Sequence, residues 1–211
     1  MFVIDSSGSI RDHNPKDGSY DNWHLLLEFM VRIVDELNID SSHVRIGAVK
    51  FSTNAESVFH MNQYSDKNSL KAAIRAISYS GGHTNIAGGI RIMNDVEFKS
   101  ENGDRPGVQN IAIVITDGNS TRDQSQTIPQ AIRARNRGIK IYSVGITNRI
   151  NGEEVRKISS SPQVKESNYW LAKDFQSLER VALAFTSAAC GTGRAGRCRV
   201  RMSSCVARRR R

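Results

Sequence analysis

Cysteine is absent from the first 189 residues of this 211-residue chain, since Cys190, Cys198 and Cys205 all come near its end. An odd count confined to one end excludes a disulfide-dense scaffold. The spacing of the three cysteines matches no zinc-site pattern, so we expect free or partly paired thiols. No apolar run approaches the length of about 20 residues that crosses a bilayer, which excludes a membrane span.

Net charge is also nearly absent from most of the chain, although the formal total is +9. Eight arginines and no acidic residue fall between Cys190 and Arg211, which leaves 22 basic against 21 acidic residues over positions 1–189. Because the charges of residues 1–189 nearly cancel, this part of the chain has no general attraction for phosphate backbones. Nucleic acid is therefore not an expected partner. Beyond Gly191 the composition is Gly, Arg, Ser and Cys without periodicity, which predicts a basic, disordered tail over 191–211.

A secretory signal is missing as well, because no positively charged segment precedes an apolar stretch at the start. The chain begins with Met1-Phe2-Val3-Ile4-Asp5, which has the character of the second half of a buried strand. We therefore expect the sequence to be a fragment that is truncated within its first strand.

Strand-like and helix-like segments alternate along positions 1–190. Short apolar runs predict strands at 2–5, 44–51, 55–61, 111–115, 139–144 and 169–171. Apolar residues at helical spacing predict helices at 21–38, 65–77, 85–96, 125–136, 153–159 and 174–189. The short corner between the second and third strands predicts an antiparallel pair.

The strand at 111–115 is apolar without alternation, which is typical of a parallel strand that helices cover on both faces. Together with the regular alternation of elements, it predicts a single α/β domain over residues 1–190. The expected architecture is doubly wound, with a mostly parallel central sheet, one antiparallel edge strand and helices on both faces.

Oxygen-bearing side chains gather in three loops of this expected sheet. Asp5, Ser7 and Ser9 follow the first strand, Asp117 follows the central strand, and Thr84 lies in a glycine-rich loop before a helix. Ligands of open α/β sheets bind beyond the carboxyl ends of the strands. Hydroxyls and carboxylates are hard donors that suit Mg²⁺, Mn²⁺ or Ca²⁺ and suit zinc poorly. Each motif alone is explained by a helix cap or a turn, but together they predict one divalent-cation site.

The pattern D-x-S-x-S, then a distant Thr, then an Asp that closes a buried strand resembles the metal-ion-dependent adhesion site of von Willebrand factor A domains. The resemblance covers about residues 1–190 and includes the order of elements, the antiparallel strand and the long closing helix. It is nearest to the A domains of collagens, matrilins and related matrix proteins. Those domains carry D-S-S-G-S and often a cysteine after the last helix, where Cys190 stands here.

The resemblance implies a role for each residue of the motif. Ser7, Ser9 and Thr84 would be direct ligands, while Asp5 and Asp117 would bind partly through waters and orient the hydroxyls. A Glu or Asp of a partner protein would complete the coordination. The loops expected around that partner contain Gly82, His83, Asn85, Gly118 and Asn119. His83 is expected to be an exposed loop residue rather than a ligand.

The same resemblance implies an extracellular binding module, and not an enzyme. Its partner would be a matrix protein such as collagen, or a second copy of the chain. Two alternatives stay open. A metal-dependent hydrolase or phosphatase of similar topology would need a nucleophile with a base, and the sequence has no G-x-S-x-G elbow and no evident general base near the metal. Polyanion binding, to heparin or nucleic acid, would use the arginine tail, which lacks interleaved aromatic residues.

Overall fold

The computed structural model of the protein describes residues 1–39, 43–147 and 149–191. The strands are β1 (Phe2–Asp5), β2 (Ala48–Phe51), β3 (Ala55–Phe59), β4 (Ile111–Thr116), β5 (Lys140–Ile146) and β6 (Tyr169–Ala172). The helices are α1 (Gly8–Asp12), α2 (Asn22–Asp35), α3 (Lys67–Arg75), α4 (Ile86–Ile92), α5 (Gln124–Asn136), α6 (Gly152–Ile158) and α7 (Leu178–Gly191). Cys198, Cys205 and the predicted tail beyond Gly191 lie outside the described residues.

The strands form one six-stranded sheet in the order β3-β2-β1-β4-β5-β6. All neighbours are parallel except β2 and β3, which pair antiparallel at one edge. The predicted doubly wound, mostly parallel sheet with one antiparallel edge strand is therefore confirmed. The strand order reverses between β1 and β4, so the carboxyl ends of these two strands flank the crevice where such sheets bind ligands.

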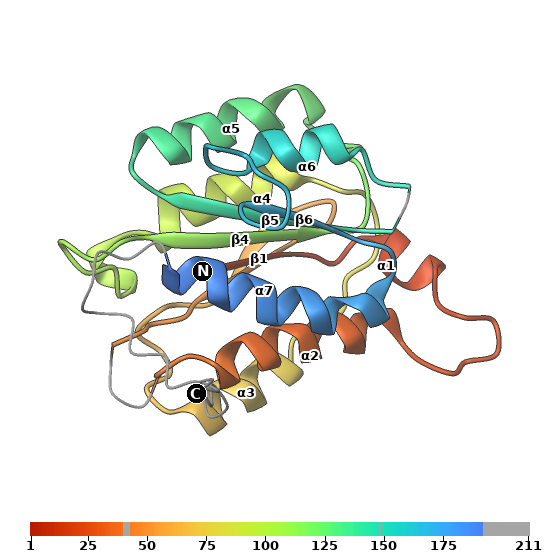
Figure 1. Ribbon diagram of the computed structural model, residues 1–211, viewed down its shortest axis with the longest axis horizontal. Coiled ribbons are helices and arrows are strands. Elements are labelled where there is room, and N and C mark those ends of the chain that lie inside the picture. Colours follow the sequence, from red (N-terminus) through yellow and green to blue (C-terminus); the bar gives the residue numbers. More distant parts are fainter. Residues whose placement is uncertain (40–42, 148, 192–211) are drawn as a thin grey trace, which may run out of the picture.

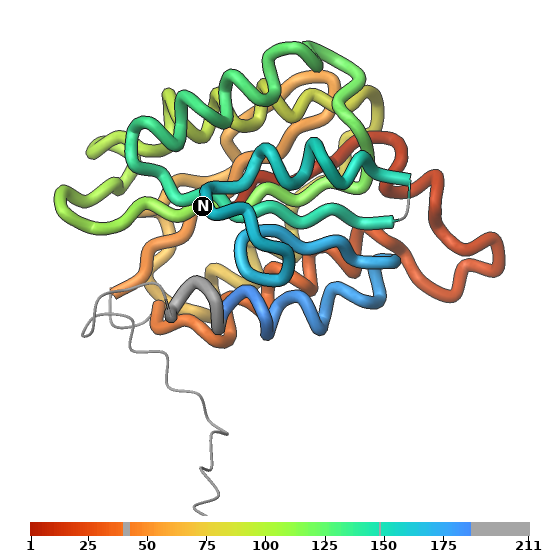
Figure 2. The backbone as a smooth tube through the Cα atoms, turned by 45° about the horizontal axis from the view of Figure 1, so that its top comes forward, coloured from red at the N-terminus to blue at the C-terminus, as the bar shows by residue number. Residues whose placement is uncertain are grey.

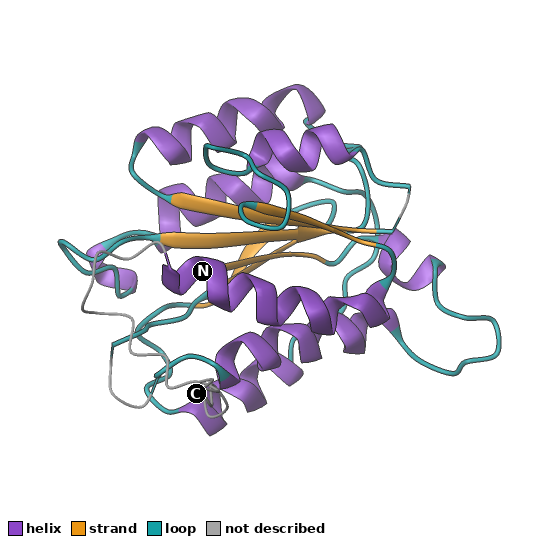
Figure 3. Ribbon diagram, viewed as in Figure 1, coloured by secondary structure: helices purple, strands orange, loops and turns teal. Residues whose placement is uncertain are grey.

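Helices cover both faces of the sheet in two layers (Figure 1). One layer contains α4, α5 and α6, and the other contains α2, α3 and α7 (Figure 3). The short helix α1 lies at the end of the sheet, and the segment between α1 and α2 projects from the body (Figure 2). The layers leave the carboxyl edge of the sheet to be closed by loops.

The central strands divide their side chains between the two layers. Ile4 and Ile113 point into the core shared with α2 and α7, whereas Val3 and Val114 point into the core shared with α4 and α5. Successive strand residues face opposite sides of a sheet, so a strand buried on both faces must be apolar throughout. This explains why the run at 111–115 shows no alternation.

Several element boundaries differ from those that the sequence predicts. The second strand begins at Ala48 rather than at residue 44, because the buried Ile46 belongs to the core without belonging to the sheet. The predicted helix at 85–96 is α-helical only to Ile92 and continues as a π-helical turn over Met93–Glu97. The closing helix is preceded by a 3-10 turn at Phe175–Ser177. The short helix α1 was not predicted at all.

The closing helix α7 is anchored by an aromatic cluster under the sheet edge. The Phe185 ring meets Tyr142 edge-on at 5.2 Å between centroids and Trp170 at 6.0 Å. All three side chains are buried.

Among the helices of the described ranges, none has both the length and the hydrophobicity that a bilayer crossing requires.

Candidate metal site at the carboxyl edge of the sheet

Asp5 is the last residue of β1, and its side chain is completely buried. Its Oδ1 accepts a hydrogen bond from the backbone N–H of Ser7 at 2.8 Å. Its Oδ2 accepts from the Thr116 hydroxyl, at the end of β4, at 2.5 Å. The carboxylate therefore fixes the start of the loop after β1 and ties the ends of two neighbouring strands together.

The chain turns from Asp5 directly into α1, which brings two serine hydroxyls to the same place. The hydroxyls of Ser7 and Ser9 lie 3.2 Å apart. Ser9 Oγ donates to Asp117 Oδ1 at 2.6 Å, across 108 positions of sequence. The Tyr79 hydroxyl donates to the carbonyl oxygens of Ser7 and Gly8 at 3.0 and 3.2 Å, which holds this turn from outside.

Thr84 reaches the site from the loop before α4 and is buried. Its backbone N–H donates to the Thr121 hydroxyl at 2.9 Å, and its carbonyl accepts from Thr121 N–H at 2.9 Å. A Cβ placed on Gly118 would lie 3.4 Å from Ser9 Oγ and 3.7 Å from Thr84 Oγ1. The hydroxyls of Ser9 and Thr84 therefore both lie close to Gly118.

The structure therefore brings all five residues of the predicted motif together. Asp5 and Ser7 are linked through the turn, Ser9 is bonded to Asp117, and Thr84 lies beside Ser9 at Gly118. Asp5, Ser7, Thr84 and Asp117 are buried, and Ser9 is partly exposed.

The two carboxylates are costly to bury together. Burial, and then the nearby charge of Asp117, raises the pKa of Asp5 to about 7, against the hydrogen bonds from Ser7 and Thr116 that lower it. Burial also raises the pKa of Asp117, opposed by its bonds from Ser9 and His13. Among the described residues, His13 is the one basic side chain within 4 Å of either carboxylate. Such a site is stabilised by any cation that reaches it.

The donor set fits a hard divalent cation. Three hydroxyls and two carboxylates offer only oxygen, which suits Mg²⁺, Mn²⁺ and Ca²⁺. Nowhere in the described chain do three or more His, Cys, Asp or Glu side chains gather as a metal-binding group. A metal held in this part of the protein would therefore depend on hydroxyl ligands.

The glycine-rich loop before Thr84 is hydrogen-bonded to the turn after β1 and to the hairpin of β2 and β3. The Gly8 N–H donates to the Gly82 carbonyl at 2.9 Å, and the His83 N–H donates to the Thr53 hydroxyl at 3.1 Å. Gly82 has a φ of +87°, and a Cβ there would lie 2.5 Å from the Thr53 hydroxyl oxygen. Both the backbone conformation and the lack of space require glycine at this position.

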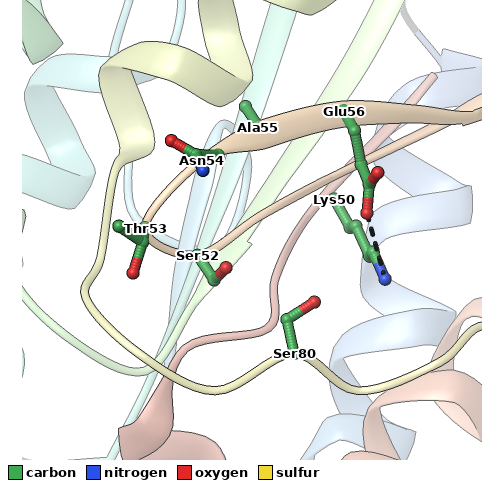
Figure 4. Close-up of a pocket in the computed structure, with 7 residues that line it drawn as sticks. All are labelled: Lys50, Ser52, Thr53, Asn54, Ala55, Glu56 and Ser80. Carbon is green, nitrogen blue, oxygen red and sulfur yellow. Dashed lines mark ion pairs between the residues drawn. The ribbon is translucent and has the colours of Figure 1, made fainter.

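A small open pocket lies between this hairpin and the loop (Figure 4). Its lining residues are Lys50, Ser52, Thr53, Asn54, Ala55, Glu56 and Ser80. The Lys50 ammonium is 3.2 Å from Glu56 and donates to the Ser78 carbonyl and hydroxyl oxygens, each at 3.0 Å. Because this charge is already paired, we assign the pocket a structural role in holding the loop that carries Thr84.

The residues expected around a partner fall into two groups. Gly82, His83 and Asn119 are exposed, and Gly118 is partly exposed. The exposure of His83 agrees with its expected place in a loop. Asn85 is buried and caps α4, since its Oδ1 accepts from the Gly88 N–H at 2.7 Å. Asn85 therefore serves the helix rather than the surface.

Sequence reasoning missed His13 and Arg149. His13 Nδ1 lies 3.4 Å from Asp117 Oδ2, and Arg149 donates to His13 Nε2 at 2.7 Å. Neither residue belongs to a periodic pattern or a recognised motif. Only the position of Arg149 shortly after a predicted strand could have drawn attention to it.

Comparisons with known proteins identify the family of the chain. Residues 1–183 match the family described as von Willebrand factor type A domain. Matrilin-1 of Homo sapiens is 30% identical over 181 residues, which are 86% of this chain and 34% of the relative. The transmembrane cell adhesion receptor mua-3 of Caenorhabditis elegans is 31% identical over 195 residues, which are 90% of this chain and 5% of the relative. The chain thus spans about a third of the length of matrilin-1.

Solved structures show the same fold. Proximal thread matrix protein 1 from the mussel byssus superposes with a TM-score of 0.80 at 23% identity, covering 90% of this chain and 47% of that one. A structure of the same byssus protein with a zinc-occupied MIDAS motif gives a TM-score of 0.78 at 22% identity, covering 90% and 47%. MIDAS is the metal-ion-dependent adhesion site. The match over residues 1–183 establishes that this chain belongs to the von Willebrand factor type A domain family.

Proposed function

We propose that this chain is a binding module that holds a divalent cation at Asp5, Ser7, Ser9, Thr84 and Asp117 and uses it to bind an acidic side chain of a protein partner. The observation that carries the proposal is the convergence of these five side chains around Gly118 and the ends of β1 and β4. The domain of this function would comprise residues 1–190.

Each side chain has a separate task in the proposed site. The hydroxyls of Ser7, Ser9 and Thr84 would be direct ligands, and the carboxylates of Asp5 and Asp117 would orient hydroxyls and bind partly through water. Two carboxylates balance the charge of a dication and leave little negative charge in excess. A bound cation would then supply an electrophilic position for one further oxygen, and a carboxylate of the partner is the natural donor.

Magnesium is the cation that we propose, with Mn²⁺ or Ca²⁺ as substitutes. The all-oxygen donor set favours these hard ions over zinc. A byssus protein of the same fold nevertheless has a structure with zinc in its MIDAS motif, so zinc belongs in every titration.

We infer that the partner is an extracellular protein, either a matrix protein such as a collagen or a second copy of this chain. The support comes from relatives: one is named a cell adhesion receptor, and a protein of the same fold is named a matrix protein. An extracellular location and the identity of the partner are part of the same proposal.

A binding role is favoured over catalysis even though the structure brings His13 to the site. A general base needs a free lone pair within reach of a substrate proton. The Nε2 atom of His13 accepts from Arg149 at 2.7 Å, and its Nδ1 faces Asp117 at 3.4 Å. Both ring nitrogens are therefore engaged, and the histidine is placed to support the site rather than to remove a proton.

Calorimetric titration with Mg²⁺, Mn²⁺ and Zn²⁺ tests the proposal. We expect the wild-type protein to bind one Mg²⁺ or Mn²⁺, and Ser7→Ala and Thr84→Val to lose that binding because each removes a ligand. Ser65→Ala is the matched control, since Ser65 is exposed and lies just before α3. Equal metal affinity in Ser7→Ala, Thr84→Val and the wild type would refute the proposal.

The second half of the test concerns the partner. A synthetic peptide that carries one glutamate should bind the Mn²⁺-saturated protein and should be released by EDTA. A matched peptide with glutamine in place of glutamate should not bind. Equal binding of the two peptides would show that the site does not take a carboxylate.

A further inference from the structure

Arg149 lies at the rim of the proposed metal site, beyond the carboxyl end of β5. Its guanidinium donates to His13 Nε2 at 2.7 Å, and the opposite ring nitrogen of His13 lies 3.4 Å from Asp117 Oδ2. A guanidinium has donors and no acceptor, so Nε2 must be the accepting nitrogen. The Nδ1 edge of the imidazole faces Asp117. Arg149, His13 and Asp117 thus form a chain from the rim to the buried carboxylate.

Thr147, two residues before Arg149, has a strained backbone conformation. Thr147 is a β-branched residue with a φ of +75°, a conformation that such residues rarely adopt. A conformation of this kind costs on the order of 1–3 kcal/mol and persists only where neighbours impose it. Here the Thr147 N–H donates to the Ala172 carbonyl at 2.9 Å, and its hydroxyl approaches the Asp117 carbonyl oxygen at 3.5 Å. Neighbouring segments therefore hold Thr147, and its hydroxyl accepts a hydrogen bond from the Arg149 backbone N–H at 3.4 Å.

Within the described part of the chain, the charge of Arg149 has no neighbouring carboxylate, unlike the charges of several other surface arginines. Arg11 pairs with Asp21 at 3.0 Å, and Arg75 and Arg156 each pair with a glutamate. For Arg149, no carboxylate of the described residues lies within 4 Å, and the side chain is exposed. One of its five N–H groups is used on His13, so an outside acceptor can take the others.

We propose that Arg149, positioned by His13, is a second carboxylate-binding subsite beside the metal, so that the preferred partner presents two acidic side chains. The inference rests on the proposed function, in which the first carboxylate binds the cation. The second carboxylate then meets a guanidinium, whose flat pair of donors matches the two oxygens of a carboxylate. The partner is thus an acidic segment of a protein rather than a surface with one isolated glutamate.

The test uses four synthetic peptides and the Mn²⁺-saturated protein. One peptide carries a single glutamate among glycine and glutamine, and three carry a second glutamate one, two or three residues further on. Affinities of all four are measured by fluorescence anisotropy for the wild type, Arg149→Gln and Arg91→Gln. Arg91 is the matched control, because it is an exposed arginine near the end of α4.

We expect at least one two-glutamate peptide to bind the wild type about three- to tenfold more tightly than the single-glutamate peptide, the range for a partly exposed charge-assisted contact. Arg149→Gln should lose this gain in affinity, whereas Arg91→Gln should keep it. If the second glutamate does not increase the affinity for the wild type, or if the increase persists in Arg149→Gln, the subsite is refuted and the proposed metal site is not. Absence of metal-dependent binding of every peptide would overturn the proposed function and the subsite with it.

Discussion

The hydroxyl of Thr116 donates to Oδ2 of Asp5 at 2.5 Å, although the two residues are 111 positions apart. This bond joins the carboxyl ends of β1 and β4 at the point where the strand order reverses. The bond also lowers the pKa of the Asp5 carboxyl group, whereas burial raises that pKa. The bond therefore connects the topology of the sheet with the ionisation of Asp5.

Replacing Thr116 with valine should weaken metal binding. The substitution keeps the shape of the side chain and removes the donor, which leaves the Asp5 carboxylate with less support for its ionised form. Hydrogen bonds to charged groups contribute about 1.5–3 kcal/mol, so calorimetry should show Mg²⁺ affinity falling about tenfold or more. Thr116→Ser keeps the hydroxyl and should remain close to the wild type. Equal affinities in valine and serine variants would contradict this role of Thr116.

The stabilisation by metal should increase with pH. The pKa of Asp5 is raised to about 7 in the folded protein from an ordinary value of 3.8, so the folded state holds a proton that the unfolded state releases. Without metal, the contribution of Asp5 to the free energy of unfolding therefore decreases as the pH rises from about 4 to about 7. A cation binds the ionised carboxylate and must displace that proton at low pH.

Thermal unfolding with and without Mg²⁺ at pH 5 and pH 8 measures this effect. We expect the increase in Tm on adding Mg²⁺ to be larger at pH 8. In Asp5→Asn the difference between the two pH values should shrink, because the titrating group is gone. A larger increase at pH 5 in the wild-type protein would contradict the assignment of Asp5.

Replacing Gly82 with alanine should destabilise the protein and weaken the metal site. The residue has a φ of +87°, and the new Cβ would lie 2.5 Å from the Thr53 hydroxyl oxygen. Gly107→Ala is the matched control, since Gly107 has a φ of +74° and no atom within 4 Å of the added Cβ. Left-handed backbone alone costs an alanine about 1 kcal/mol.

Urea unfolding should show a larger loss of stability in Gly82→Ala than in Gly107→Ala. Only Gly82→Ala should also lose Mg²⁺ affinity, because its carbonyl accepts from Gly8 in the turn that carries Ser7 and Ser9. If both variants kept the wild-type affinity, the loop before Thr84 would not support the site.

Replacing Phe185 with alanine should destabilise the domain without affecting the metal ligands directly. The ring packs between Tyr142 and Trp170 and anchors α7, so its removal leaves a cavity that costs about 3–5 kcal/mol. Leu183 on the same helix is 60% exposed, and Leu183→Ala should change stability by less than about 0.5 kcal/mol. Similar unfolding midpoints for the two variants in urea would contradict the packing of α7.

Much of the fold and most of the site follow from local sequence patterns. The apolar run at Ile111–Ile115 identifies a strand covered on both faces, and parallel strands place Asp5 and Asp117 at one edge of the sheet. Asp21 caps α2, with its side chain accepting from the Trp23 N–H, and aspartate is a residue type that local sequence favours at a helix start. These features depend on neighbours in sequence and on the direction of strands.

The features that sequence did not predict depend on distant contacts. The helix α1 has only five residues and one buried apolar side chain, Ile10, which is too short for a periodic signal. His13 and Arg149 meet across 136 positions in loops without a motif. Ile46 is buried like a strand residue but lies outside the sheet, and hydrophobicity cannot separate these two situations. Tertiary packing determines whether each of these features forms.

Every role proposed for the site depends on one cation that binds among Ser7, Ser9, Thr84 and the two aspartates. Anomalous diffraction at the manganese edge, from a crystal of the wild-type protein soaked in Mn²⁺, locates such a cation. We expect one strong peak bounded by the hydroxyl oxygens of Ser7, Ser9 and Thr84. A well-occupied peak at another place, or no peak beside these hydroxyls at saturating Mn²⁺, would contradict it.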